Sequence, residues 1–167
     1  MLAANNYHLG ALSKNDIGHF VFFMKNKEIY DNTLTVPFPY TEEHAVKFIE
    51  QHQDSKLDFA IRNIMGELVG CIGATQSKNQ PHIASLGYWL AKPYWGKGIM
   101  TDVVRVFSDY LFKEFPELSR ITANCFEHNI GSARVLEKSG FTLEGLAIKH
   151  YKKDGAFYNA KLYGRVL

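Results

Sequence analysis

The chain has few cysteines and no pattern that would use them together. Cys71 and Cys125 are the only two cysteines in 167 residues, and neither belongs to a CxxC pair. A small secreted domain held together by disulfides needs several paired cysteines, so that class is excluded. Both thiols lie in segments with strand-like patterns. We therefore expect two small buried side chains in a protein of a reducing compartment, the cytoplasm.

Long apolar runs, an excess of one charge and metal-ligand spacings are also absent. No segment approaches the ~18 consecutive apolar residues of a membrane span, and the first residues do not form a charged and apolar leader. Nineteen basic residues against seventeen acidic ones give a net charge of +2, which is too balanced for a protein that binds nucleic acid through its phosphates. The seven histidines show no HxxxH spacing, so we predict no metal site.

The length and the apolar patterns predict the fold class. At 167 residues the chain can bury a full core, and the simplest expectation is one domain over residues 1–167. The apolar periodicities predict the element order β α α β β β α β α β β, which is an α+β plan with a mixed sheet. The expected strands are 7–11, 56–62, 67–75, 83–90, 120–126, 142–151 and 159–166, and the expected helices are 14–26, 41–53, 99–115 and a short one after Asn129.

The rest of the chain is organised around residues 83–107. Residues 83–90 carry no charge and predict a central strand buried on both faces. After Gly96, Lys97 and Gly98 an apolar stripe predicts a helix. The start of a helix offers unpaired N–H groups, and glycine lets a phosphate approach the backbone. Two interpretations stay open here, a pyrophosphate site and a tight turn between strand and helix.

Several short motifs recur along the chain in a fixed order. They are PFPYT at 37–41, GYWL at 87–90, WGKGIMT at 95–101, NIGS at 129–132, SGFTLEG at 139–145 and the closing residues from Asp154 to Tyr163. The most specific feature is a Gly-x-Gly loop followed about thirty residues later by Asn-x-x-Ser and Gly-Phe. Over nearly its whole length the chain therefore resembles the GNAT (GCN5-related) N-acetyltransferases, and within them the RimJ/RimL-like ribosomal-protein N-terminal acetyltransferases.

This resemblance implies a GNAT-like, mostly antiparallel sheet flanked by helices, with a V-shaped split between its central strands. It also implies that acetyl-CoA is bound, with its pantetheine against backbone groups of Trp89 and Leu90 and its pyrophosphate on the loop that opens the helix. The residues implied to contact the coenzyme are Trp89, Leu90, Trp95, Gly96, Lys97, Gly98, Ile99, Met100, Thr101, Asn129 and Ser132. Asn129 and Ser132 have a second interpretation as caps of the short helix.

The implied reaction is direct transfer of the acetyl group to an amine, without an acetyl-enzyme. A neutral amine attacks the thioester carbonyl, and Ser132 donates a proton to the leaving thiolate. Tyr151 stands where some relatives carry a carboxylate, which makes it the second implied catalytic residue. The favoured acceptor is a protein N-terminus such as that of a ribosomal protein. The alternatives are a small-molecule amine (polyamine, aminoglycoside or amino acid) and a non-catalytic acyl-CoA-binding module.

Four positions depart from the family pattern: Ser85, Pro93, Tyr151, and Asn159, which stands where an Asp is common. Ser85 replaces a carboxylate that often acts as the base, and Pro93 replaces the Arg or Gln that usually opens the phosphate loop. The candidates for the missing base are His82, Glu127, His128, His150 and Tyr151. These departures bear on the base and on the identity of the acceptor more than on the acetyl-CoA site.

Overall fold

A computed structural model describes residues 2–4 and 6–167, with side chains from residue 6 onward. Two compact units can be distinguished along the chain. Unit 1 comprises the chain up to Gly73 together with Tyr88–Ile99, and unit 2 comprises Ala74–Gly87 and Met100–Leu167. The expectation of a single domain over residues 1–167 stays a prediction.

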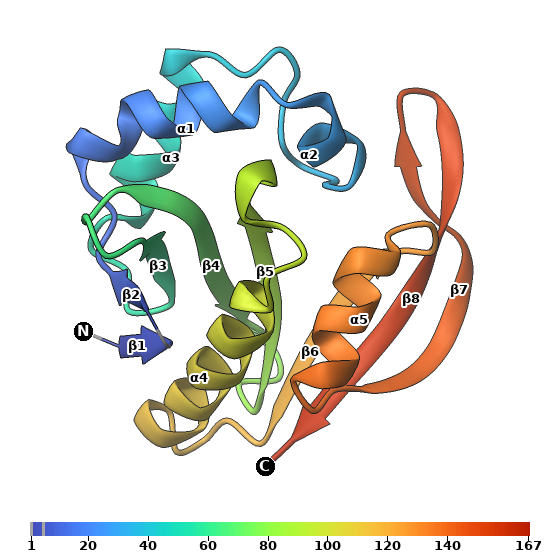
Figure 1. Cartoon of the computed structure of the whole chain (residues 1–167). Helices are drawn as coiled ribbons and strands as arrows, with labels where there is room; N and C mark the ends of the chain where they lie inside the picture. Colours follow the sequence, from blue (N-terminus) through green and yellow to red (C-terminus); the bar gives the residue numbers. More distant parts are fainter. Residues whose placement is uncertain (1, 5) are drawn as a thin grey trace. The chain divides into compact units, whose positions relative to one another are not determined.

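Unit 1 combines an antiparallel sheet with three short helices (Figure 1). Its strands pair in the order β1, β2, β3, β4, and α1 packs beside α3. Its elements are β1 (Leu2–Ala4), β2 (Tyr7–Gly10), η1 (Lys14–Asp16), α1 (Ile17–Met24), α2 (Lys27–Asp31), α3 (Glu42–His52), β3 (Asp58–Arg62), the larger part of β4 (Leu68–Gln76), the end of β5 (Ile83–Leu90) and η2 (Lys92–Tyr94).

Local capping explains where the helices of unit 1 begin. The Ser13 N–H donates to Asp16 Oδ2 at 2.8 Å and starts η1 and α1, while the Thr41 side chain accepts from the N–H of His44 at 3.4 Å and starts α3. Both starts agree with the sequence prediction. The first helix ends at Met24, two residues earlier than expected, and the five-residue α2 was not predicted. β1 was not predicted either.

The core of unit 1 forms between the helices and the sheet. Phe20 of α1 packs edge-on against Trp89 at the end of β5, with ring centroids 5.3 Å apart. Asp16 is buried and accepts two hydrogen bonds from Arg62, of 2.6 and 2.8 Å. The other buried core residues of this cluster are Leu12, Met24, Ile29, Tyr40, Ala45, Ile49, Ala60, Leu68 and Cys71.

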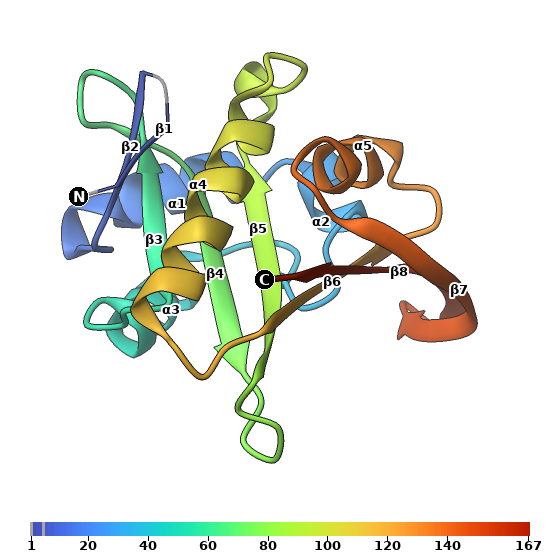
Figure 2. The same ribbon diagram turned by 90° about the horizontal axis from the view of Figure 1, so that it is seen from below.

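Unit 2 carries two helices and the remaining strands. In Figure 1, α5 lies in front of β6, with which it is in contact. Figure 2 shows the β4–β5 connection projecting beyond the ends of its two strands. The elements are the end of β4, the larger part of β5, α4 (Ile99–Glu114, whose first residue belongs to unit 1), β6 (Arg120–Phe126), α5 (Ile130–Lys138), β7 (Thr142–Lys153) and β8 (Ala156–Val166).

The strand pairing confirms the α+β class and the mixed, mostly antiparallel sheet. The sheet has eight strands in the order β1-β2-β3-β4-β5-β6-β8-β7. β5 and β6 run parallel, and their register ends at the pair Leu86 and Ala123, although both strands continue beyond it. This is the position at which the expected split requires the two strands to part.

One prediction about the central strand is wrong. Residues 83–90 form β5, but Ser85 and Gly87 are exposed, whereas Ala84 and Leu86 are buried. Successive side chains of a strand point to opposite faces. The first part of β5 is therefore buried on one face only. The absence of charge was mistaken for burial on both faces, because Ser, Gly and Tyr also tolerate exposure.

Candidate active site

The backbone at the end of β5 is fixed from two sides within unit 1. The Leu90 carbonyl accepts a hydrogen bond of 2.6 Å from the Trp95 indole Nε1, which ties the chain after η2 back to the strand. On the other side, a Cβ added at Gly70 would lie 2.6 Å from the Trp89 carbonyl oxygen. Glycine in β4 therefore allows the close approach of the two backbones. The two residues expected to contact the pantetheine are thus held by Trp95 and by the lack of a side chain at Gly70.

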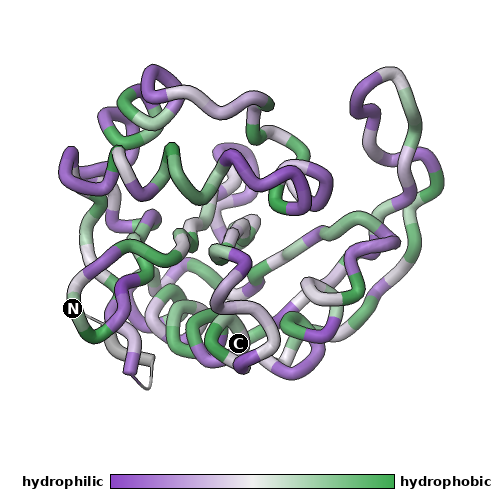
Figure 3. The backbone as a smooth tube through the Cα atoms, turned by 45° about the horizontal axis from the view of Figure 1, so that its top comes forward, coloured by the Kyte–Doolittle hydropathy of each residue, from purple (hydrophilic) through white to green (hydrophobic). Residues whose placement is uncertain are grey.

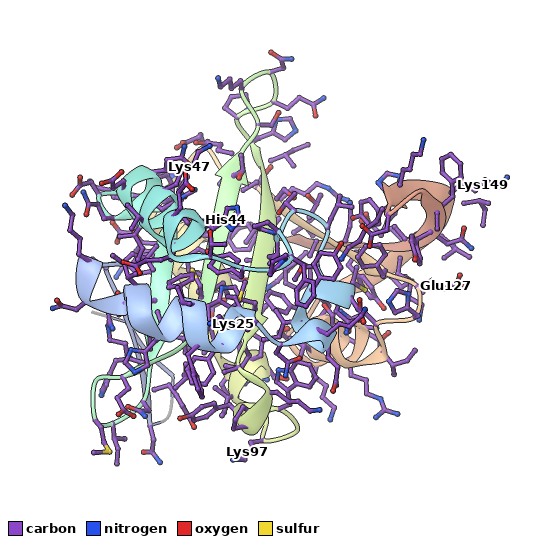
Figure 4. All side chains as sticks on the ribbon, turned by 90° about the horizontal axis from the view of Figure 1, so that it is seen from above. Lys25, His44, Lys47, Lys97, Glu127 and Lys149 are labelled. Carbon is purple, nitrogen blue, oxygen red and sulfur yellow. The ribbon has the colours of Figure 1, made fainter. Side chains whose placement is uncertain are left out.

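The loop between η2 and α4 contains two glycines in left-handed conformations and leads into the start of a helix. Gly96 and Gly98 have φ angles of 73° and 77°, in the left-handed region that side chains disfavour. A Cβ at either position would meet no atom within 4 Å, so packing does not explain the glycines. The loop and Lys97 are exposed, and Figure 4 shows the Lys97 side chain extending away from the ribbon. These residues fit a pyrophosphate, with backbone N–H groups as donors and Lys97 as a mobile cation.

The first residues of α4 offer backbone groups rather than side chains. Ile99 and Met100 are 6% and 5% exposed, so both side chains point into the protein. Their predicted contact with the coenzyme is therefore limited to their N–H groups, which a helix of 16 residues leaves unpaired in its first turn. Thr101, one residue later, is half-buried. Pro93 lies in the η2 turn and donates no hydrogen bond.

In unit 2, the start of α5 brings Ser132 to the end of β6. The Asn129 side chain accepts a hydrogen bond of 3.0 Å from the Ser132 N–H, so the predicted cap is present. The Ser132 side chain is in turn hydrogen-bonded to Cys125, which is buried on β6. From its sequence pattern, Cys125 was predicted to be a small buried side chain only. The alternation of side chains along a strand could have indicated its orientation, because it places Cys125 on the face of β6 opposite to Asn124.

Tyr151, on β7, also lies beside the end of β6. Its ring lies 5.0 Å from that of Phe126, and its side chain is hydrogen-bonded to Asn124. The two predicted catalytic residues, Ser132 and Tyr151, therefore come from different elements of unit 2 and lie beside consecutive residues of β6, Cys125 and Asn124, whose side chains point to opposite faces of the strand.

Burial controls the protonation of this cluster. Burial raises the pKa of the Cys125 thiol, and a hydrogen bond from Ser132 only partly opposes the shift. Burial also raises the pKa of Tyr151, partly opposed by its bond with Asn124. Both groups keep their protons at neutral pH, so Cys125 is no nucleophile and Tyr151 donates hydrogen bonds rather than accepting a proton.

The structure separates the candidate bases. Glu127, His128 and His150 are exposed residues beside this cluster: the His128 ring stacks on Phe126 at 5.2 Å, and the His150 ring lies 4.8 Å from that of Tyr151. His82 is elsewhere, because its carbonyl accepts from the Ser119 and Arg120 N–H groups where β6 begins. At ~3.3 Å per residue, the length of β6 places that point roughly 20 Å from Phe126.

The position of Tyr151 depends on a bulge that the sequence analysis did not predict. In the β7–β8 pairing, Ala147 faces Ala160 and Tyr151 faces Tyr158, so three residues of β7 oppose the single residue Asn159. Lys149 within the bulge has a φ of 51°. Its N–H donates to Asn159 Oδ1 at 2.9 Å, and Asn159 Nδ2 donates to Glu127 Oε2 at 2.9 Å. The left-handed lysine is therefore held by an amide side chain.

Two other kinds of feature are absent from the part of the chain that the structure describes. Residues 2–4 and 6–167 contain no group of three or more His, Cys, Asp or Glu side chains arranged to hold a metal ion. No helix within these residues is long and apolar enough to cross a membrane.

The similarity to known proteins extends over most of the chain. The sequence profile of the acetyltransferase (GNAT) domain matches residues 8–142. The Probable N-acetyltransferase YjcK of Bacillus subtilis (strain 168) is 39% identical over 125 residues, which are 71% of this chain and 68% of YjcK. The ribosomal-protein-serine acetyltransferase of Escherichia coli (strain K12) is 25% identical over 170 residues, with 98% and 94% of the two chains covered.

Solved structures share the fold at lower identity. The GNAT-family acetyltransferase of Bacillus anthracis superposes with a TM-score of 0.89 at 23% identity, covering 99% of this chain and 97% of that one. The microcin C7 self-immunity acetyltransferase MccE, in complex with acetyl-CoA and AMP, superposes with a TM-score of 0.87 at 20% identity, covering 98% of this chain and 93% of that one. With a matching family profile over residues 8–142 and a relative of 39% identity, this chain belongs to the GNAT family and is an acetyl-CoA-dependent N-acetyltransferase.

Proposed function

We propose that this enzyme transfers the acetyl group of acetyl-CoA to the α-amino group of a protein N-terminus. The observation that carries the proposal is that Ser132 and Tyr151 both lie at the end of β6, near a thiol that burial keeps protonated. A cluster of neutral hydroxyl and thiol groups suits direct transfer to an amine, because it can supply a proton to a leaving thiolate and contains no activated nucleophile.

The residues take the following roles in this proposal. Backbone N–H groups of residues 96–101 bind the pyrophosphate, with Lys97 as a cation, and the Trp95 indole fixes the start of this loop. Backbone groups of Trp89 and Leu90 hold the pantetheine, and Asn129 contacts its amide. Ser132 gives a proton to the departing thiolate and takes one back from the positively charged nitrogen of the tetrahedral intermediate, so its hydroxyl is regenerated, while Cys125 beside it helps to fix the position of that hydroxyl.

A strong base is not required for such an acceptor. An α-amino group has a pKa of ~8, so a useful fraction is already neutral near pH 8. Tyr151 keeps its proton and hydrogen-bonds the acceptor or the acetyl oxygen. The exposed Ser85 is compatible with this chemistry.

The acceptor class is supported by the relative that spans nearly the whole chain. The Escherichia coli protein that is 25% identical over 98% of this chain is named a ribosomal-protein-serine acetyltransferase. We extend that acceptor type, a protein N-terminus, to this chain. The profile match over residues 8–142 includes parts of both units, which supports one functional domain. The two free, buried cysteines support a reducing compartment such as the cytoplasm.

The test is thiol release from acetyl-CoA with a panel of acceptors. Short peptides that begin with Ser, Ala or Met are compared with the same peptides acetylated at the N-terminus, with spermidine and with an aminoglycoside. We expect release only with free peptide N-termini, and a kcat at least about tenfold lower for Ser132→Ala. Turnover of spermidine but not of peptides would favour a small-molecule acetyltransferase. Coenzyme binding without turnover of any amine would contradict the enzyme assignment for this chain.

A matched variant separates the role of Ser132 from helix capping. Ser132→Ala keeps the backbone N–H that Asn129 caps, so its unfolding free energy should change by less than about 1 kcal/mol. Asn129→Ala removes the cap and should cost about 1 kcal/mol. If both variants lost activity only in proportion to stability, capping alone would explain the motif.

A further inference from the structure

Asn159 connects the two segments that carry Ser132 and Tyr151. Its main-chain carbonyl accepts from the Glu127 N–H at 3.0 Å, its Nδ2 donates to Glu127 Oε2 at 2.9 Å, and its Oδ1 accepts from the Lys149 N–H at 2.9 Å. Glu127 begins the connection from β6 to Asn129 and α5, while Lys149 is the centre of the β7 bulge. Figure 4 shows the labelled Glu127 and Lys149 on the same side of unit 2.

The bulge sets the position of Tyr151 along β8. If the register of Ala147 and Ala160 continued without interruption, Tyr151 would face Ala156 instead of Tyr158. Two residues of strand correspond to roughly 7 Å, so a regular hairpin would carry Tyr151 away from Phe126 toward the hairpin tip. The contact between the Tyr151 and Phe126 rings at 5.0 Å therefore exists because of the bulge.

The bulge needs support because of its backbone conformation. Lys149 has a φ of 51°, which is unfavourable for a residue with a side chain. The hairpin is also poorly buried here: residues 148–150 are all exposed, and hydrophilic and hydrophobic stretches alternate along it in Figure 3. The Lys149 Nζ lies 5.9 Å from the centroid of the exposed Phe157 ring, so packing contributes little, and the hydrogen bond of 2.9 Å from the Lys149 N–H to Asn159 Oδ1 is the main contact that supports this geometry.

Only an amide of this length matches both partners. The Lys149 N–H requires an acceptor and the Glu127 carboxylate requires a donor. Asparagine supplies one of each, aspartate supplies acceptors only, and alanine supplies neither. Asn159 is thus matched to Glu127 in polarity as well as in position.

We propose that Asn159 is a positioning residue of the acetyl transfer: its side chain links the β6–α5 connection to the β7 bulge and so holds Ser132 and Tyr151 in register. This inference rests on the proposed function. Asn159 itself contacts no reacting atom. Its loss changes the geometry of the cluster, and a shift of about 1 Å in such a site lowers the rate by up to roughly a hundredfold.

A reciprocal exchange tests the proposal. Asn159→Ala removes both side-chain bonds, and Asn159→Asp places two carboxylates against each other. In the double variant Asn159→Asp with Glu127→Gln, the aspartate accepts from the Lys149 N–H and from the new glutamine amide, so the bridge is rebuilt with its polarity reversed. We expect the two single Asn159 variants to lose about ten- to a hundredfold in kcat with a nearly unchanged KM for acetyl-CoA, and the double variant to recover to within about threefold of wild type.

Two controls make the outcome specific. Asn79→Asp makes the same chemical change in the exposed β4–β5 connection and should leave kcat unchanged. Hydrogen exchange at the Lys149 amide should accelerate in Asn159→Ala and return toward wild type in the double variant, which reports the bridge independently of activity. Faster exchange with wild-type kcat would overturn the positioning role while leaving the proposed function intact. A double variant no better than Asn159→Asp would also overturn it. A wild-type enzyme inactive on every amine would refute the proposed function, and this inference with it.

Discussion

The glycine loop before α4 allows a sharp test of coenzyme binding, because the chain contains a matched control. Gly98 and Gly66 have φ angles of 77° and 81°, and a Cβ at either would meet no atom within 4 Å. Alanine therefore imposes the same left-handed strain at both positions and no clash, at a cost of about 1–2 kcal/mol. Gly66 lies in the β3–β4 turn, which no prediction connects to the coenzyme.

The expected effect on binding differs between the two variants. A methyl group at position 98 occupies the space through which a phosphate approaches the loop and tilts the donor N–H groups. The loss of one hydrogen bond to a charged group is worth about 1.5–3 kcal/mol, which corresponds to a Kd for coenzyme A that rises at least about tenfold. Gly66→Ala should bind coenzyme A as the wild type does.

Calorimetric titration with coenzyme A and thermal unfolding measure the two quantities separately. For a chain of this length the strain corresponds to a Tm lowered by about 2–8 °C, and the shift should be similar in both variants. If Gly98→Ala bound coenzyme A with wild-type affinity at the same loss of Tm, the pyrophosphate would not lie on this loop. The glycines would then only shape the turn.

Two further predictions concern the packing of unit 1. Gly70→Ala would bring a Cβ to 2.6 Å from the Trp89 carbonyl oxygen and should lower the unfolding free energy by about 1–3 kcal/mol. A Cβ at Gly87 would meet no atom within 4 Å, so Gly87→Ala should leave the unfolding free energy nearly unchanged. Equal urea midpoints for the two variants would contradict this prediction. Burial raises the pKa of Tyr40 to about 12. Because the folded state holds this phenolic proton more tightly than an unfolded chain does, stability should fall as pH rises from about 10 toward 12, and urea unfolding should show a smaller loss for Tyr40→Phe.

Much of the fold could be predicted because its signals are local. The Thr41 cap, the Asn129 cap and the left-handed Gly140 each depend on residues within one or two turns of chain, and the structure contains all three. β6 and α4 have regular apolar patterns, so their bounds were predicted to within a residue. α2 was missed because five residues are too few to show a helical period.

The sequence by itself determined the family and predicts the residues assigned to the coenzyme, because a Gly-x-Gly loop, a helix cap and a turn each depend on consecutive residues. Only the tertiary structure decided how the two predicted catalytic residues are placed. The contacts of Ser132 with Cys125, of Tyr151 with Phe126, and of Asn159 with Lys149 join residues that lie on different elements. The bulge that places Tyr151 contains a hydrogen bond across two strands, and strand periodicity gives no sign of such a bond before the strands are paired.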